Sequence, residues 1–122
     1  MNEKIFKEWT KKLAIAILKL IGEMPHSIPA EAIARQIVRS GTSIGANYRS
    51  ACRAKSTADM INKLKIVEEE SDETVYWLEL IIEMGFLPQE KISPISKEVN
   101  EIVAMTVASI KTLRASSKAH KA

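Results

Sequence analysis

Hydrophobic residues recur through most of the chain at alternating steps of three and four residues, the period of an amphipathic α-helix. Clusters of proline, glycine and small polar residues interrupt this pattern at 24–29, 54–57 and 85–94. Proline and glycine are poorly tolerated inside helices, and serine favours a helix start, so each cluster is expected to be a link. The pattern therefore predicts four helices, at about 3–22, 29–53, 56–84 and 93–115.

The predicted helix ends carry residue types that helix termini favour. Ser56 is a good N-cap, and Asp59 lies three residues further on, in a position resembling a capping box. Gly85 is expected at the C′ position after the third helix, where glycine stops a helix most easily. Ser93 is expected to cap the fourth helix, with Pro94 in its first turn.

Short links between amphipathic helices favour packing of each helix against the next in antiparallel order. The predicted fold class is therefore all-α, an antiparallel up-down-up-down four-helix bundle. Residues 1–115 are expected to form this bundle as one domain. Residues 116–122 have no apolar content to bury, so they are expected to form a disordered basic tail.

The second helix should have a core face and a close-contact face, although Gly41 and Gly45 are poor helix formers. On a helical wheel, one arc carries core-type side chains: Ile33, Ile37, Ile44, Tyr48 and Ala51. The neighbouring arc carries small side chains: Ala34, Gly41, Gly45 and Cys52. Small residues let another backbone come close, so this second arc predicts a tight helix–helix contact.

A stripe of arginines lies on the far side of the same helix, within roughly 80° on the wheel. It consists of Arg35, Arg39, Arg49 and Arg53. A charged stripe is most often a solvated surface. The sharper hypothesis is phosphate binding, because the arginine fork matches phosphate oxygens. No aromatic residue interleaves these arginines, so stacking of bases is not indicated.

The third helix has the opposite charge, with an acidic block in its middle. The block consists of Glu68, Glu69, Glu70, Asp72 and Glu73. Like charges at this spacing repel, and a nearby cationic surface would relieve the repulsion. The arginine stripe is one candidate, either in the same chain or in another subunit. Such pairing would compete directly with phosphate binding.

Composition and charge narrow the classes of protein without naming a function. The chain has 46% hydrophobic, 27% charged and 5% aromatic residues, a composition that suits a helical protein. Its net charge of +3 is too weakly basic to indicate nucleic-acid binding by itself. A single cysteine excludes an internal disulfide, and no apolar run reaches the ~18 residues of a membrane span. We expect a cytoplasmic protein that does not bind a membrane.

The sequence contains no convincing set of catalytic, cofactor-binding or metal-binding residues. His26 lies in a predicted link and His120 in the tail, away from any Glu-x-x-His spacing. Cys52 has no histidine beside it and falls on a packing arc. There is no glycine-rich phosphate loop, nucleophile elbow or zinc spacing. We therefore expect a protein that is not an enzyme and needs no cofactor.

Three segments, 39–47, 56–64 and 70–78, resemble the four-helix-bundle proteins of the 23S rRNA intervening-sequence family of bacteria. The most specific motifs are Ser-Ile-x-x-Asn, ending at Asn47, and Glu-x-x-Glu-Thr-x-Tyr-Trp-Leu, beginning at Glu70. The resemblance implies a bundle that commonly assembles as a ring-shaped homopentamer, has no established catalytic activity and is suspected of binding nucleic acid; some members carry a ribosomal-protein label. Many members continue after the asparagine as Ile-Ala-Glu-Gly, whereas this chain continues as Tyr-Arg-Ser-Ala.

Four polar residues near these motifs are expected to have structural roles: Ser43, Asn47, Glu70 and Glu73. Asn47 lies at the edge of the core face of its helix. We expect it to form a buried hydrogen bond to the third helix, at Glu70 or Glu73, because buried polar groups need partners. The alternative is that Asn47 belongs to a small ligand pocket where subunits meet.

Apolar residues off the main helical stripes predict assembly, because large exposed apolar patches usually mark interfaces. They are Ile5, Ile15, Ile21, Tyr76, Trp77 and Leu80. We expect a homo-oligomer, a pentamer by family resemblance.

The leading functional hypothesis is a non-enzymatic oligomeric bundle that binds RNA, another nucleic acid or a ribonucleoprotein through the arginine stripe. The alternative is a protein-interaction or scaffold module without nucleic-acid binding.

Overall fold

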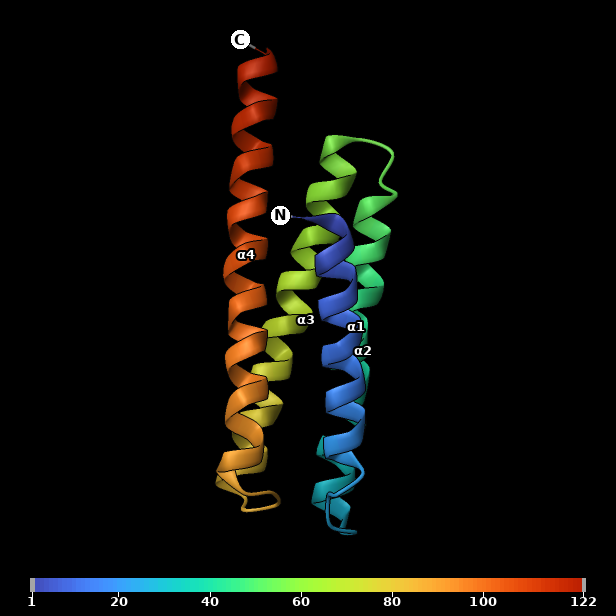
Figure 1. Cartoon of the computed structure of the whole chain (residues 1–122), viewed down its shortest axis with the longest axis vertical. Coiled ribbons are helices and arrows are strands. Elements are labelled where there is room, and N and C mark those ends of the chain that lie inside the picture. The colour runs from blue at the N-terminus through green and yellow to red at the C-terminus, as the bar shows by residue number, and fades with distance from the viewer. Residues whose placement is uncertain (1, 122) are drawn as a thin grey trace.

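The computed structural model describes residues 2–121, with side-chain surroundings up to residue 118. The described residues form four helices and no strand: α1 (Glu3–Ile21), α2 (Ile28–Cys52), α3 (Thr57–Glu83) and α4 (Gln89–Lys121). Figure 1 shows that the chain reverses direction at each link, so neighbouring helices are antiparallel. The predicted fold class, an up-down-up-down four-helix bundle, is confirmed.

The helix starts depend on side-chain caps, as the sequence indicated. Asn2, Ser27 and Ser56 each cap a helix by accepting a hydrogen bond from a backbone N–H three residues ahead. Asp59 completes the α3 start, because its Oδ2 accepts from the backbone N–H of Lys55 at 3.2 Å. Gly85 follows the end of α3 with a φ of 69°, the left-handed conformation in which glycine is least strained.

The start of α4 differs from the prediction, because the helix begins at Gln89 and Pro94 lies inside it. Ser93 is therefore not its N-cap. Proline lacks an N–H, so at this position it leaves one carbonyl without its helical partner, that of Glu90. The extra turn brings Ile92 into the core, where it is 0% exposed. Burial of that side chain explains why the helix extends past a residue that normally marks a boundary.

The end of α4 also differs, since the helix continues to Lys121 where the sequence predicted an end near 115. Residues 116–121, expected to be a disordered tail, contain neither glycine nor proline, and alanine and lysine favour helix. Figure 1 shows this end of α4 extending beyond the other three helices.

The core runs along the length of the bundle between the helices. α2 packs most extensively on α3, then α3 on α4 and α1 on α2, while α1 and α4 share the least contact. The predicted core face of α2 is buried except for Ile33, which is partly buried. The largest side chains with at most 1% exposure include Phe6, Leu13, Ile17, Ile37, Ile44, Leu64, Leu78, Ile81 and Ile102.

The small-residue arc of α2 makes the predicted close contact, and its partner is α1. A Cβ atom added to Gly41 would lie 2.8 Å from Ile17 Cδ1. One added to Gly45 would lie 3.0 Å from Thr10 Oγ1 and 3.3 Å from Thr10 Cβ. Both separations are shorter than ordinary van der Waals contact, so the two helices could not be this close with larger residues there.

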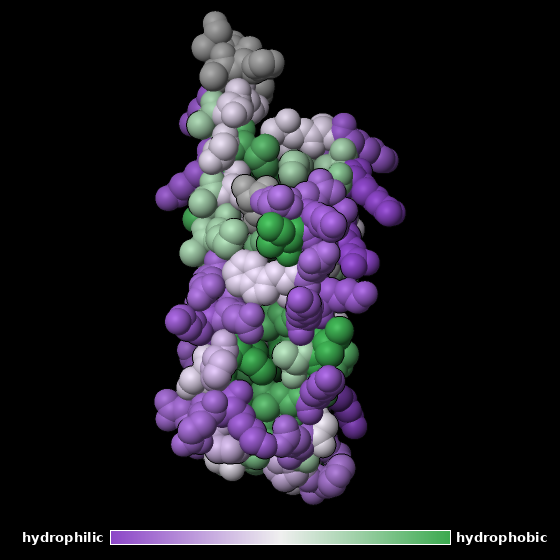
Figure 2. Space-filling view, viewed as in Figure 1, coloured by the Kyte–Doolittle hydropathy of each residue, from purple (hydrophilic) through white to green (hydrophobic). Residues whose placement is uncertain are grey.

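Large apolar side chains remain on the surface of the single chain. Ile5, Ile15, Leu18, Ile28, Tyr76, Met84 and Met105 are each at least 38% exposed. Three other predicted off-stripe residues, Ile21, Trp77 and Leu80, are partly buried within the chain. Figure 2 shows hydrophobic surface gathered along the seam between α1 and α4, framed by polar side chains. No helix within the described residues is both long and apolar enough to cross a membrane.

Candidate nucleic-acid interface

The arginine stripe of α2 does not act as one surface, because its members face different neighbours. Arg39 points to α3 and bonds two glutamates there. Arg49 and Arg53 border a groove that they share with α1. Arg35 is exposed and makes no ion pair among the described residues. The stripe therefore combines a structural arginine with arginines that remain open to a ligand.

Arg39 is held by a two-glutamate clamp on α3. Its Nη1 donates to both carboxylate oxygens of Glu70, each at 3.2 Å, and its Nη2 donates to Glu73 Oε1 at 2.5 Å. Trp77 Nε1 also donates to Glu73 Oε1, at 3.2 Å. The hydrogen bond from Arg39 lowers the pKa of the Glu73 carboxyl below its ordinary value. The predicted pairing of the stripe with the acidic block therefore occurs within the chain, at Arg39.

A buried hydroxyl pair lies beside this clamp and was not identified in the sequence. Thr74 Oγ1 and Ser40 Oγ are 2.9 Å apart, and both residues are 0% exposed. Thr74 Oγ1 also donates to the Glu70 carbonyl oxygen at 2.8 Å. Ser40 lies between Ile37 and Ile44 at helical spacing, a pattern that could have placed it in the core. The pair fixes how α2 and α3 align, because an unpaired buried hydroxyl is costly.

The predicted hydrogen bond from Asn47 to α3 is wrong. Asn47 Nδ2 donates to the Ser43 carbonyl oxygen at 2.9 Å, and Ser43 Oγ donates to the Arg39 carbonyl oxygen at 2.6 Å. Both side chains therefore bond one turn back within α2, as short polar side chains do when no closer partner exists. Arg39, whose longer side chain reaches α3, occupies Glu70 and Glu73 instead.

The second part of the stripe borders a cationic groove, which we define by Lys7, Lys11, Arg49 and Arg53. Two adjoining hollows of about 410 and 310 Å³ make up the groove, and both are lined by Lys7 and Arg49. Lys11 lines the larger hollow and Arg53 the smaller one. Four cations, from α1 and from the last turn and C-cap of α2, thus line two hollows that share Lys7 and Arg49.

The close contact between α1 and α2 explains why the groove forms. Gly45 and Thr10, which meet at that contact, both line the larger hollow. Ala14 and Ala46 also line it, so small side chains leave the space that the long cationic side chains surround. Lys7 and Lys11 are four residues apart on α1 and project from one helix face, while Arg49 lies in the last turn of α2 and Arg53 is its C-cap.

The charge around the groove is weakly compensated. Glu3 Oε1 lies 2.7 Å from Lys7 Nζ and is exposed. Lys11, Arg49 and Arg53 make no ion pair among the described residues. α1 carries five lysines against two glutamates, whereas α3 carries two lysines against eight acidic residues. Cations therefore concentrate at the α1–α2 side of the bundle and carboxylates at α3.

The geometry supports binding of an anion more than covalent chemistry. Among the described residues, no three histidine, cysteine or acidic side chains are placed to hold a metal ion. Burial raises the pKa of the Cys52 thiol, which keeps it protonated and unreactive at neutral pH. The lining of the groove contains no aromatic ring, so it can contact phosphates but cannot stack bases.

Comparisons with known proteins agree with this fold. The family model described as 23S rRNA-intervening sequence protein matches residues 3–108. A crystal structure at 1.70 Å of a protein of unknown function from the S23 ribosomal protein family of Bacteroides thetaiotaomicron VPI-5482 is similar, with a TM-score of 0.83 and 38% identity. That match covers 91% of this chain and 99% of the other. No curated protein shows a significant match.

Proposed function

The chain belongs to the 23S rRNA-intervening sequence protein family, and from that premise we propose that it is a non-enzymatic bundle that binds RNA through backbone phosphates. The cationic groove is the proposed site. The observation that carries the proposal is the convergence of Lys7, Lys11, Arg49 and Arg53 on two hollows that share Lys7 and Arg49. An RNA partner implies a cytoplasmic location.

The chemistry of the groove favours sequence-independent binding. Arginine and lysine donate to phosphate oxygens and release the counterions of the nucleic acid, which is the main source of non-specific affinity. Without an aromatic ring in the lining, the groove cannot stack bases, and contacts to phosphates carry no sequence information. The proposal therefore predicts similar affinity for RNAs of different sequence.

A salt-dependent RNA titration tests the proposal. Each phosphate contact should contribute about 0.7–0.9 to the log–log slope of affinity against salt, so four cations predict a slope of roughly 3. The double variant Arg49→Gln/Arg53→Gln should lower the slope by about 1.4–1.8. The matched double variant Lys63→Gln/Lys65→Gln, which removes two cations from α3, should leave it unchanged. Equal losses from both pairs would exclude the groove as the binding site.

We further propose that copies of the chain assemble, most simply as the pentamer implied by the family resemblance. The supporting observation is the exposed apolar surface of α1, where Ile5 is 63%, Ile15 43% and Leu18 46% exposed. The same surface also favours the alternative function, a protein-interaction scaffold without RNA binding. Light scattering at micromolar protein should give a multiple of the chain mass, and a monomeric mass would overturn the assembly proposal.

A further inference from the structure

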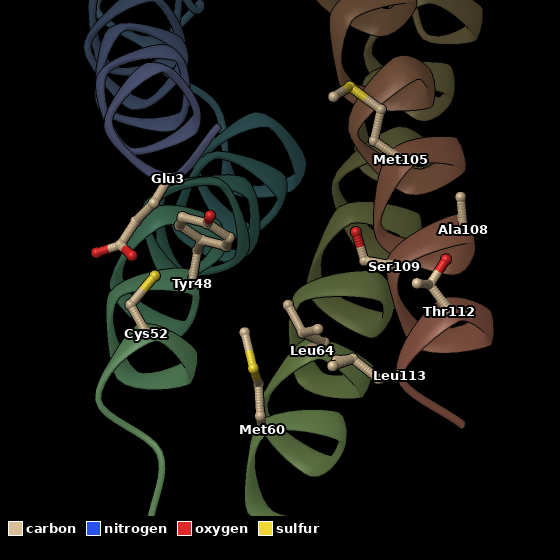
Figure 3. Close-up of a pocket in the computed structure, with 10 residues that line it drawn as sticks. All are labelled: Glu3, Tyr48, Cys52, Met60, Leu64, Met105, Ala108, Ser109, Thr112 and Leu113. Atoms are coloured by element: carbon tan, nitrogen blue, oxygen red, sulfur yellow. The ribbon is translucent and has the colours of Figure 1, made fainter. Parts of the chain in front are cut away.

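A pocket of about 450 Å³ opens at the end of the bundle where α2 ends and α3 begins. All four helices contribute to its lining, including Glu3 of α1, Tyr48 of α2, Leu64 of α3 and Ser109 of α4. Figure 3 shows Tyr48, Cys52 and Glu3 on one side of the opening and the α4 side chains on the other. The pocket is separate from the cationic groove, except that Glu3 lines it and pairs with Lys7.

The apolar part of the pocket is well suited to a small ligand. Leu64 is 1% and Tyr48 4% exposed, so both are fixed by the core behind them. Met60 and Met105 also line the pocket, and Met105 is 38% exposed. Methionine side chains are flexible and polarisable, so they adapt to ligands of different shape. The volume lies within the ~300–1,000 Å³ that is typical of small-molecule sites.

One wall of the pocket carries two hydroxyl groups from α4. Ser109 and Thr112 are three residues apart on α4 and make no side-chain hydrogen bond among the described residues. Thr106, one turn earlier, behaves differently, because its Oγ1 donates to the Ile102 carbonyl oxygen at 2.7 Å. Figure 3 places both hydroxyls on the α4 side of the opening. They are available to a hydroxyl or carbonyl group of a ligand.

The charge of the lining indicates which ligands the pocket can accept. Glu3 is the one charged residue among the lining residues, and its carboxylate is paired with Lys7 Nζ, 2.7 Å away, which lies outside the lining. Burial raises the pKa values of both Tyr48 and Cys52, so these groups stay neutral at physiological pH. The lining itself therefore offers no cation to a ligand anion, which would lose hydration on entering a mainly apolar pocket.

We propose that this pocket binds a small uncharged amphipathic molecule. Its apolar body, aromatic or branched aliphatic, rests against Leu64, Tyr48 and the two methionines, and its hydroxyl or carbonyl group faces Ser109 and Thr112. A single helical turn, about 10 Å wide and 5.4 Å long, fills about 420 Å³, so a pocket of about 450 Å³ could receive no more than one turn of a second copy. That occupant is one outcome of the test below.

Methionine-methyl NMR with 2-naphthol as the probe tests the proposal, because the chain carries its own internal controls. Met60 and Met105 line the pocket, whereas Met24 and Met84 do not. Titration of the full chain should shift the first two methyl signals saturably and leave the other two in place. The anion 2-naphthoate, which has the same ring system, should bind at least several-fold more weakly.

Paired variants then identify the groups responsible. Ser109→Ala/Thr112→Val should weaken 2-naphthol binding by about 5–150-fold, as expected for two lost hydrogen bonds, whereas Ser96→Ala on the same helix should have no effect. Ala108→Trp fills the pocket and should abolish the shifts, whereas Ala104→Trp, at an exposed position outside the lining, should retain them.

Three outcomes would overturn the proposal. The first is absence of any saturable shift at Met60 and Met105. The second is an equal shift at Met24, Met60, Met84 and Met105, which would indicate non-specific adsorption. The third is a change of the Met60 and Met105 signals on dilution of the protein alone, which would show that a second copy occupies the pocket.

Discussion

Arg39 and Arg49 lie ten residues apart on one helix and on one predicted stripe, yet their surroundings are opposite. Arg39 donates to Glu70 and Glu73 of α3. Arg49 borders a groove with Lys7 and makes no ion pair among the described residues. A helical wheel gives the direction of a side chain but not the charge of the neighbouring helix. The role of an arginine is therefore set by the helix that it faces.

The two interfaces of α2 differ in the same way. Towards α3, charges are paired and a buried Ser40–Thr74 hydrogen bond aligns the helices. Towards α1, small residues bring the backbones together and cations of like sign gather around the contact. Like charges destabilise a fold modestly, and water and salt screen them. Clustering of cations around the α1–α2 contact therefore does not stabilise the fold, and it is more readily explained by binding of an anionic ligand.

The largest effect on stability is expected at the close contact of α1 with α2. Gly45→Leu would force its side chain against Thr10 and should lower the free energy of unfolding by about 1–3 kcal/mol. Ala46→Leu is the matched control, because Ala46 is exposed; its effect should stay within about 0.5 kcal/mol. Urea denaturation measures both. Equal stability of the two variants would show that no close contact exists at Gly45.

A smaller effect is expected at the α2–α3 interface. Thr74→Val removes one member of the buried hydroxyl pair and should cost about 1–2 kcal/mol, because Ser40 keeps its buried hydroxyl and loses its partner on α3. Adding Ser40→Ala to this variant should recover part of the loss, since both polar groups are then gone. The four proteins form a double-mutant cycle in urea. A cycle without coupling would contradict the hydrogen bond.

The Arg39 clamp should give a smaller effect still, because the guanidinium is half exposed. The size of this effect depends on pH. The folded-state pKa of Glu73 is lowered by Arg39, so the clamp stabilises the fold above the ordinary carboxyl pKa and loses this contribution as pH falls through the lowered value. Arg39→Gln should therefore be less stable than the parent at pH 7, and thermal melts should converge in strong acid. A constant difference across this range would exclude the clamp as its cause.

The smallest effect on stability is expected at the cationic groove. Arg49→Gln removes a charge that has no ion-pair partner among the described residues, so stability should stay within a few tenths of a kcal/mol and could rise slightly. Urea denaturation at low salt measures the stability of this variant, because repulsion among the cations of the groove is strongest there. A loss as large as that of Thr74→Val would show that Arg49 has a structural role.

The elements that the sequence predicted well are those determined by local chemistry. Ser56 and Gly85 mark helix ends because a hydroxyl cap and a left-handed backbone act within one turn. The start of α4 was missed because burial of Ile92 outweighs the local effect of Pro94. Lys7 and Lys11 were missed as part of the site for a related reason. Their place beside the arginines depends on how α1 lies against α2, which no single helix encodes.

The central claim is that Arg49 binds a ligand, whereas Arg39 stabilises the packing of α2 on α3. The most direct test measures the salt dependence of RNA affinity for Arg39→Gln, Arg49→Gln and the double variant. Arg49→Gln should reduce the log–log slope by about 0.7–0.9, and Arg39→Gln should leave it unchanged. The slope of the double variant should therefore fall by the contribution of one phosphate contact and not of two. Equal reductions from the two single variants would contradict the division of the stripe, and no reduction from Arg49→Gln would contradict phosphate binding at the groove.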